Sequence, residues 1–286
     1  MSRPAATAWS RLRRSSSAMI SLGVVLLYVF AAVGTEVYAA WCESNHVIPV
    51  YQQPDDTARY APPSPEHWLG TDYQGRDVLL RAIAGSATAV KVGVIASLIA
   101  AVIGVALGAA AGFYGGKFDD AVVWAYSTFA SMPTLLFILA FALLVSRNFL
   151  SPGMMHAAEL LGSVLRAETM RLKTMPFVSA ARVAGVGSAV IIRRHILPNV
   201  FHLVIIYFTL SFAGAIMLEV IVSYLGFGVQ SAPSWGVMIS DGQERLWRGI
   251  WWEIAAATGF MFVLVLALNV LGDSLRDALD PRQRTL

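Results

Sequence analysis

The stretch FVSAARVAGVGSAVIIRRHILPN, Phe177 to Asn199, decides how this chain is placed in a membrane. It carries three arginines and a histidine and is interrupted by Gly185 and Gly187. The rest of the chain is mostly apolar: of the 286 residues, 57% are hydrophobic and only 14% are charged. Soluble domains are about half apolar and about a quarter charged. The composition therefore predicts a membrane protein, in which a basic segment of this length needs an explanation.

Five segments are long and apolar enough to cross about 30 Å of hydrocarbon, which takes roughly 20 residues. They are residues 18–40, 90–113, 121–145, 200–227 and 250–271. A sixth segment, residues 153–172, is not identified by hydropathy alone, because it contains several titratable side chains: His156, Glu159, Arg166, Glu168 and Arg171.

The distribution of arginines favours counting the sixth segment. With the basic stretch 11–14 in the cytoplasm, five crossings would place the arginines of the opening stretch and of the C-terminal tail outside, against the positive-inside rule. The sequence therefore predicts an all-α polytopic bundle of about six transmembrane helices with both termini in the cytoplasm. We expect the fourth helix to be short and covered by protein, because its charges need partners.

The N-terminal region has two interpretations. The first apolar segment could be a cleaved signal sequence, but it is longer than a signal needs, and cleavage would disturb the predicted topology. Residues 41–85 contain five prolines before a Gly-Thr-Asp turn, which predict a structured extracytoplasmic connector. We divide the chain into residues 1–85, with the first helix and the connector, and residues 86–286, a core of five helices with a cytoplasmic loop at 173–198.

Two features of the apolar segments are candidate sites. Gly104, Gly108 and Gly112 lie on one face of the second helix, where small residues let another helix approach closely. We favour packing over a role in conduction. Glu219 is an acidic residue in apolar sequence, which suggests a proton relay or a pathway lining. We favour an acid near the outer end of its helix that is hydrogen-bonded or solvated.

Familiar enzyme motifs are absent from the sequence. The stretch AAGFYGGKF is not a phosphate-binding loop, because Ala111 replaces its first glycine and Phe118 its hydroxyl residue. No H-E-x-x-H or G-x-S-x-G occurs, and the histidines lack metal-ligand spacing. The single cysteine, Cys42, excludes an internal disulfide. We expect neither a catalytic site nor a metal site.

The opening stretch contains two short helix-compatible segments separated by Gly185-Val186-Gly187, with Pro198 closing the second and beginning the next helix. Phe177, Ala180, Ala181 and Ala184 form a small apolar face beside Arg182. An interfacial helix on lipid usually presents bulky side chains, so this face favours a groove on a soluble protein partner.

At these residues the sequence resembles the permease subunits of ABC importers, whose cytoplasmic signature is E-A-A, three residues, Gly, nine residues and I-x-L-P. The chain matches it at Ala180, Ala181, Gly185 and the Leu-Pro pair, whereas Ser179 replaces the acid and His195 the first isoleucine. Four further stretches resemble the C-type permeases of dipeptide, oligopeptide and nickel uptake systems. They are GTDYQGRDVLLRAIAGS (70–86), AGFYGGKFDD (111–120), PSWGVMISDG (233–242) and GDSLRDALDPR (272–282).

The resemblance implies a multi-pass permease in the cytoplasmic membrane of a prokaryote, without an ATPase site of its own. The residues that would contact a cytoplasmic ATPase are Phe177, Ser179, Ala180, Ala181, Arg182, Gly185, Leu197 and Pro198. ATP and Mg would bind to one or two partner ATPases. The other implied partners are a homologous second permease, an extracytoplasmic substrate-binding protein and membrane lipid, but no nucleic acid.

The resemblance implies peptides as the commonest cargo, with nickel or another small solute as the alternative. Two functions of other classes compete with an ABC permease. A proton-coupled secondary carrier would transport without ATPases, and a membrane scaffold would bind partners and move nothing.

Overall fold

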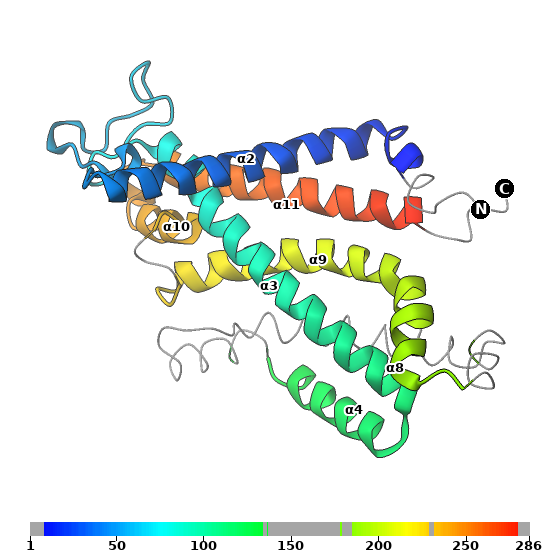
Figure 1. The fold of residues 1–286 in the computed structure, drawn as a ribbon. Helices are drawn as coiled ribbons and strands as arrows, with labels where there is room; N and C mark the ends of the chain where they lie inside the picture. The colour runs from blue at the N-terminus through cyan, green and yellow to red at the C-terminus, as the bar shows by residue number, and fades with distance from the viewer. Residues whose placement is uncertain (1–8, 134–135, 137–177, 179–184, 229–231, 280–286) are drawn as a thin grey trace. The chain divides into compact units, whose positions relative to one another are not determined.

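The structure of the chain, a computed structural model, describes residues 9–133, 136, 178, 185–228 and 232–279 (Figure 1). Within these residues the regular elements are helices, and the one extended pairing is an isolated bridge between Thr71 and Asp77. The longer helices are α2 (Ser16–Ser44), α3 (Val78–Tyr114), α4 (Gly116–Ala130), α9 (Leu197–Tyr224), α10 (Trp235–Gln243) and α11 (Trp252–Leu279). The prediction of an all-α fold is confirmed for this part of the chain.

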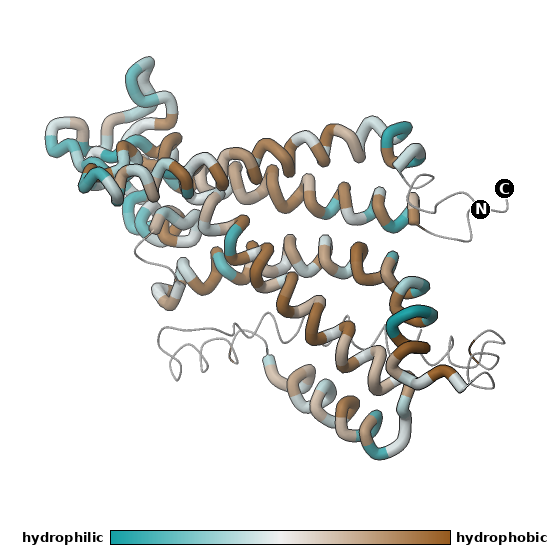
Figure 2. The backbone as a smooth tube through the Cα atoms, in the orientation of Figure 1, coloured by the Kyte–Doolittle hydropathy of each residue, from teal (hydrophilic) through white to brown (hydrophobic). Residues whose placement is uncertain are grey.

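Among the described residues, four helices are long and apolar enough to cross a membrane. They are α2, α3, the combined path Ser188–Tyr224 and α11, and they contain or overlap the first, second, fifth and sixth predicted spans. Figure 2 shows apolar residues along these helices and more polar residues in the connector between α2 and α3. Helix α4 covers the beginning of the third span, and the fourth span lies outside the described residues.

The chain divides into two compact units, each made of separate stretches. The first comprises residues 1–8, 95–212 and 275–286, and the second comprises residues 9–94 and 213–274. Helices α3 and α9 each contribute to both units. The sequence-based division at residue 85 stays a prediction.

The core of the first unit brings α3 together with the stretch around α8 (Ser188–Ile191). Ile191, Ile196 and Val200 are fully or almost fully buried and cluster with Phe113 of α3. Their spacing of four to five residues places them on one side of the helical path, as expected for a helix with one packed face. The other side of this path stays exposed.

The second unit is held by capped helices and buried tryptophans. Ser15 caps α2 and Ser234 caps α10 by accepting hydrogen bonds from the backbone N–H groups of Ala18 and Gly236. Trp235 is fully buried and donates from Nε1 to the carbonyl of Ala82 at 2.8 Å. The sequence positions 82 and 235 are thus held together by one side chain that fills the core and satisfies its own polar atom.

The connector between α2 and α3 contains two short 3-10 helices, η1 (Val50–Gln52) and η2 (Asp56–Ala58). Trp252, at the start of α11, donates from Nε1 to the carbonyl of Thr71 at 2.9 Å. Gly70 has a positive φ of 70°, and a Cβ there would lie 2.9 Å from the ring of Trp252. The glycine of the Gly-Thr-Asp turn is therefore required both by backbone conformation and by the close tryptophan.

Candidate functional site

The predicted ATPase-contacting residues are only partly described. Phe177, Ser179, Ala180, Ala181 and Arg182 lie outside the described residues, whereas Gly185, Leu197 and Pro198 lie within them. Their role in contacting an ATPase stays a prediction.

Gly185 occupies a turn with a positive φ of 77°. No heavy atom lies within 4 Å of the place where a Cβ would stand. The requirement for glycine here comes from the left-handed backbone conformation and not from lack of space. A side chain at this position would therefore act on the direction of the turn itself.

Pro198 lies in the first turn of α9, as predicted, but the prediction that it closes the preceding helical segment is wrong. α8 continues through a π-helical turn, η3 (Ile192–Ile196), directly into α9, in which Pro198 is the second residue. Proline lacks the backbone N–H and crowds the carbonyl four residues earlier, so a regular α-helix would kink or break. The π turn changes the hydrogen-bond pattern just before the proline, and Figure 1 shows the helical path turning between α8 and α9.

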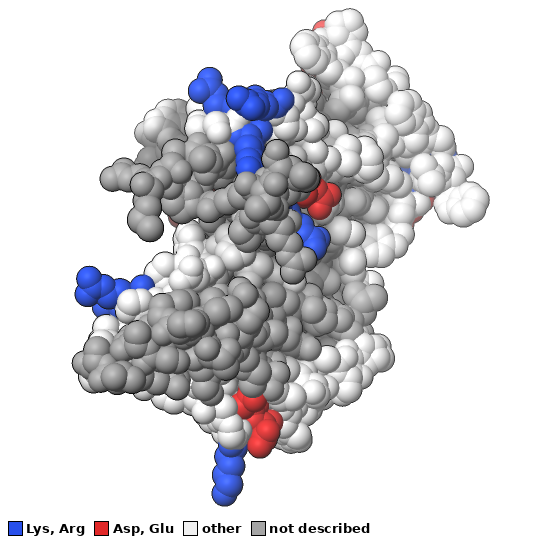
Figure 3. Space-filling view, turned by 90° about the vertical axis from the view of Figure 1, so that its right-hand side faces the viewer, with Lys and Arg blue, Asp and Glu red and all other residues white. Residues whose placement is uncertain are grey.

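The path from α8 into α9 has a basic exposed side. Arg193 and Arg194 are exposed and, together with Ala189 and Val190, line an open hollow of about 400 Å³. Figure 3, which looks onto the side where α8 lies in Figure 1, shows several Lys and Arg side chains projecting outward and fewer Asp and Glu side chains among the described residues. The segment thus combines a packed apolar side with an exposed basic side, without deep burial of any charge.

Gly104, Gly108 and Gly112 are all buried in α3. Their spacing of four residues places them on one side of the helix, where they leave room for close packing. The preference for packing over conduction at this face stays a prediction.

Glu219 is buried in α9, with 8% of its surface exposed. Its Oε1 accepts hydrogen bonds from the hydroxyls of Ser223, at 2.7 Å, and Ser234, at 2.8 Å. Ser234 also caps α10, so one carboxylate links α9 to the beginning of the next helix. The geometry favours a hydrogen-bonded anchor, and a role for Glu219 in transport stays a prediction.

A cluster of charged residues that sequence reasoning did not single out lies at the beginning of α3. Asp72 is fully buried and accepts at Oδ2 from Arg76 Nε at 2.6 Å and from Arg81 Nη1. Its Oδ1 accepts from the backbone N–H groups of Gln74 and Arg76 at 2.8 and 3.0 Å. Each oxygen of this carboxylate thus faces two donors, which compensates the cost of burying the charge.

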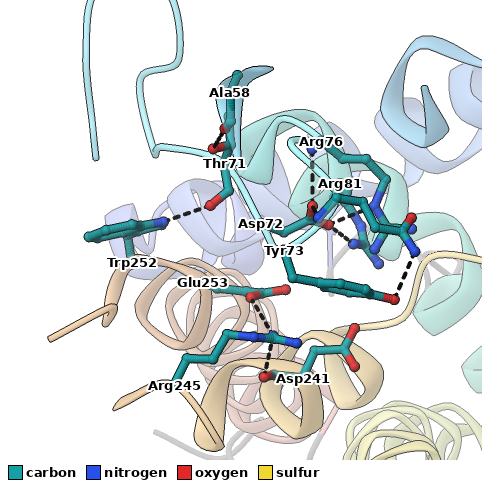
Figure 4. Close-up of polar contacts among 11 residues, drawn as sticks. Ala58, Thr71, Asp72, Tyr73, Arg76, Arg81, Asp241, Arg245, Trp252 and Glu253 are labelled. Atoms are coloured by element: carbon teal, nitrogen blue, oxygen red, sulfur yellow. Dashed lines mark hydrogen bonds and ion pairs between the residues drawn. The ribbon is translucent and has the colours of Figure 1, made fainter. Parts of the chain in front are cut away.

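A second part of the charged cluster joins the connector to α10 and α11. The guanidinium of Arg245 lies 4.5 Å from the ring centre of Tyr73, and its Nη1 lies 3.6 Å from Oε2 of Glu253. It also donates to the backbone carbonyl of Asp241. Figure 4 shows the Tyr73 ring between Arg245 and the ion pairs of Asp72. Cation–π and ionic contacts thus fix one arginine against three separate elements.

Glu253 is the unusual member of this cluster. It is 1% exposed, and neither carboxylate oxygen has a hydrogen-bond partner in the described part of the chain. Buried carboxylates normally accept several hydrogen bonds. Its 3.6 Å contact with Arg245 is the ion pair that compensates it.

No group of three or more metal-ligating side chains gathers anywhere in the described ranges. The charged cluster pairs its carboxylates with arginines, which is a donor set unsuited to a cation. The arrangement can bind polar or charged groups and hold helices together, and its residues do not form a nucleophile and base pair.

Two family models match this chain, and they cover most of its length. Residues 104–285 match the binding-protein-dependent transport system inner membrane component, and residues 3–63 match the N-terminal TM domain of oligopeptide transport permease C. The dipeptide transport system permease protein DppC of Bacillus subtilis is 34% identical over 97% of this chain and 85% of its own length. The oligopeptide transport system permease protein OppC of Escherichia coli K12 is 40% identical over 76% of this chain and 73% of its own.

Proposed function

Because the chain belongs to the family of binding-protein-dependent transport system inner membrane components, we propose that it forms half of the translocation pathway of an ATP-driven peptide importer in a prokaryotic cytoplasmic membrane. The names of two relatives, a dipeptide and an oligopeptide permease, support peptides as the cargo. The four apolar helices of the described residues support a multi-pass chain. Nickel or another small solute is the alternative cargo.

The proposed partners supply the functions that we do not expect in this chain: ATP hydrolysis, the other half of the pathway and capture of the cargo. One or two cytoplasmic ATPases hydrolyse ATP with Mg, a homologous permease completes the pathway, and an extracytoplasmic binding protein delivers the cargo. Within this arrangement the cytoplasmic loop lies at residues 173–198, and the connector between α2 and α3 lies outside the cell.

One observation carries the proposal for coupling: the uninterrupted helical path from Ser188 through η3 into α9. A segment docked on an ATPase at residues 177–185 would be joined to a membrane-spanning helix through the short turn at residues 185–187 alone. The buried side of this path packs into the first unit, and its basic side remains exposed. Movement of the docked segment would therefore be passed through this turn and the continuous helical path to α9.

The test compares two glycines in the same backbone conformation. Gly185 and Gly249 have φ values of 77° and 80°, and a Cβ added to either glycine would have no neighbour within 4 Å. Replacing either by valine strains the turn by about 1–2 kcal/mol. In the assembled transporter we expect Gly185→Val to uncouple ATP hydrolysis from uptake and Gly249→Val to leave the coupling ratio unchanged.

A bulky residue on the predicted apolar face provides a second variant. We expect Ala181→Trp to assemble in the membrane but to lose uptake driven by ATP. Wild-type uptake by both Ala181→Trp and Gly185→Val would refute the coupling assignment. Uptake by the isolated chain driven by a proton gradient would favour a secondary carrier, and unchanged cellular uptake after deletion would favour a scaffold.

The orientation is tested with cysteine labelling. The single native cysteine, Cys42, is buried and is first replaced by alanine. Ser188 and Asp56 are both exposed, and Asp56 lies in the connector. In intact cells we expect an impermeant thiol reagent to label Asp56→Cys and not Ser188→Cys. External labelling of Ser188→Cys would overturn the six-span topology.

A further inference from the structure

A polar cavity of about 380 Å³ opens beside the charged cluster of the second unit. Its lining comes from the connector, the first turn of α3, the two residues Ala232 and Pro233 ahead of α10, and α10 itself. The side chains that matter here are Gln52, Tyr73, Arg76, Arg81, Val237 and Asp241. Cavities of a few hundred Å³ with a small number of converging polar groups are typical of small-molecule sites.

The cavity is lined by two cations that share one anion. Arg76 and Arg81 both pair with Asp72, which is fully buried behind them and is not part of the lining. Their side chains are 13% and 6% exposed. A guanidinium has five N–H donors, and Arg76 uses Nε and Arg81 Nη1 toward Asp72. Each therefore retains donors that can be offered to a second carboxylate.

A carboxylate of the protein completes the lining. Burial raises the pKa of Asp241, although Arg81, Arg245 and Arg76 act in the opposite direction by favouring its charged form. Figure 4 shows the carboxylate of Asp241 near the end of the Tyr73 ring that carries the phenolic hydroxyl. An ammonium group near Asp241 would offset the cost of burying its charge.

We propose that this cavity binds the carboxylate of a free peptide, with Arg76 and Arg81 as donors and Asp241 beside the positive end. A zwitterion matches the lining better than a dianion, because both signs of charge line the same hollow. Water exclusion at the buried guanidiniums strengthens charge-assisted hydrogen bonds to the carboxylate. The proposal rests on the proposed peptide import and places a cargo site on the connector side of the chain.

The test adds a charge to the cavity lining and leaves the ion pairs of Asp72 with Arg76 and Arg81 unchanged. Gln52 lines the cavity, and the adjacent Gln53 does not, so Gln53→Glu is the matched control. The full chain in lipid nanodiscs is titrated with dialanine and with dialanine amide, whose C-terminus is neutral. For dialanine we expect Gln52→Glu to raise Kd about fivefold and Gln52→Lys to lower it by a similar factor, since the added charges act on one carboxylate at partly exposed positions.

The amide separates a carboxylate site from a general peptide site. We expect dialanine amide to bind at least about tenfold more weakly, the range that a lost charge-assisted contact of about 1.4 kcal/mol produces, and to respond much less to the charge at position 52. Equal binding of dialanine and its amide, or a shift in the same direction for Gln52→Glu and Gln52→Lys, would overturn the proposal.

A photo-crosslinking residue at Val237 identifies the source of the carboxylate in the assembled transporter. We expect an adduct with a radiolabelled dipeptide during turnover. An adduct with the substrate-binding protein alone would show that the cavity receives a protein side chain, and it would refute the proposal that the cavity binds a free peptide. Uncoupling by Gly185→Val is measured separately, so failure of the cavity proposal leaves the proposed import function standing.

Discussion

Replacement of Asp72 by asparagine tests whether the charged cluster holds the connector to the helices. The change keeps the shape of the side chain and an oxygen that can accept from the N–H groups of Gln74 and Arg76. It removes the negative charge shared by Arg76 and Arg81, whose side chains are 13% and 6% exposed. Breaking a buried ion pair from one side costs about 3–5 kcal/mol. At about 2–4 °C per kcal/mol, the melting temperature should fall by roughly 10 °C.

Unfolding can be followed through the native residue Cys42, and an exposed ion pair of the same chain serves as the control. Cys42 is fully buried, so a fluorogenic maleimide reacts with it only as the structure opens on heating. The control is Asp56→Asn, which breaks the exposed 2.5 Å pair with Arg59. Exposed pairs contribute about 0–1 kcal/mol, so this variant should melt within about 3 °C of the wild type. Equal shifts for the buried and the exposed pair would refute the reasoning.

Three further predictions address charges elsewhere in the second unit. Lys91 pairs with Glu36 on another membrane-spanning helix at 2.6 Å, so Lys91→Met should leave Glu36 uncompensated and lower the melting temperature. Adding Glu36→Gln should restore most of the loss, as a double-mutant cycle would measure. Burial raises the pKa of Asp241 above its unfolded value, so its contribution to stability is present at low pH and is lost as pH rises through the folded pKa. Asp241→Asn should therefore gain stability relative to the wild type as pH rises above the unfolded value of about 4, as melts at each pH would measure. Replacing Asp72 by asparagine together with Arg76 by leucine and Arg81 by methionine keeps an acceptor for the N–H groups of Gln74 and Arg76. This triple variant should melt within a few degrees of the wild type but bind no dialanine, as titration in nanodiscs would measure.

The spans could be predicted because the bilayer imposes a length and an apolarity that one segment satisfies by itself. α2, α3 and α11 follow this rule, and the structure extends each of them beyond the predicted bounds. The additional turns, such as residues 78–89 of α3, carry Arg81 and several small residues that hydropathy does not count. They are helical because protein covers them, which is a property of the folded chain and not of the segment.

The helical path through Pro198 and the charged cluster could not be predicted from local sequence. Proline rules describe a regular α-helix, and η3 removes that condition by changing the hydrogen-bond register before Pro198. The cluster brings Tyr73 and Arg245 to 4.5 Å across more than 170 positions of sequence. The spacing of Asp72 and Arg76 was the one local signal, since charges of opposite sign four residues apart suggest a pair.

The charges of Asp72, Arg76 and Arg81 could serve either stability or ligand recognition. A buried ion pair is weak support for stability, because desolvation offsets much of the attraction and apolar side chains of similar size often stabilise a protein as well or better. The cluster of Asp72, Arg76 and Arg81 therefore has no need of charge for holding the connector alone. Trp252 and Trp235 already join α11 and α10 to the connector and to α3 by buried hydrogen bonds. Arg76 and Arg81 line a 380 Å³ cavity, and Asp72 holds them from behind, so recognition of a charged ligand explains these charges better than packing does.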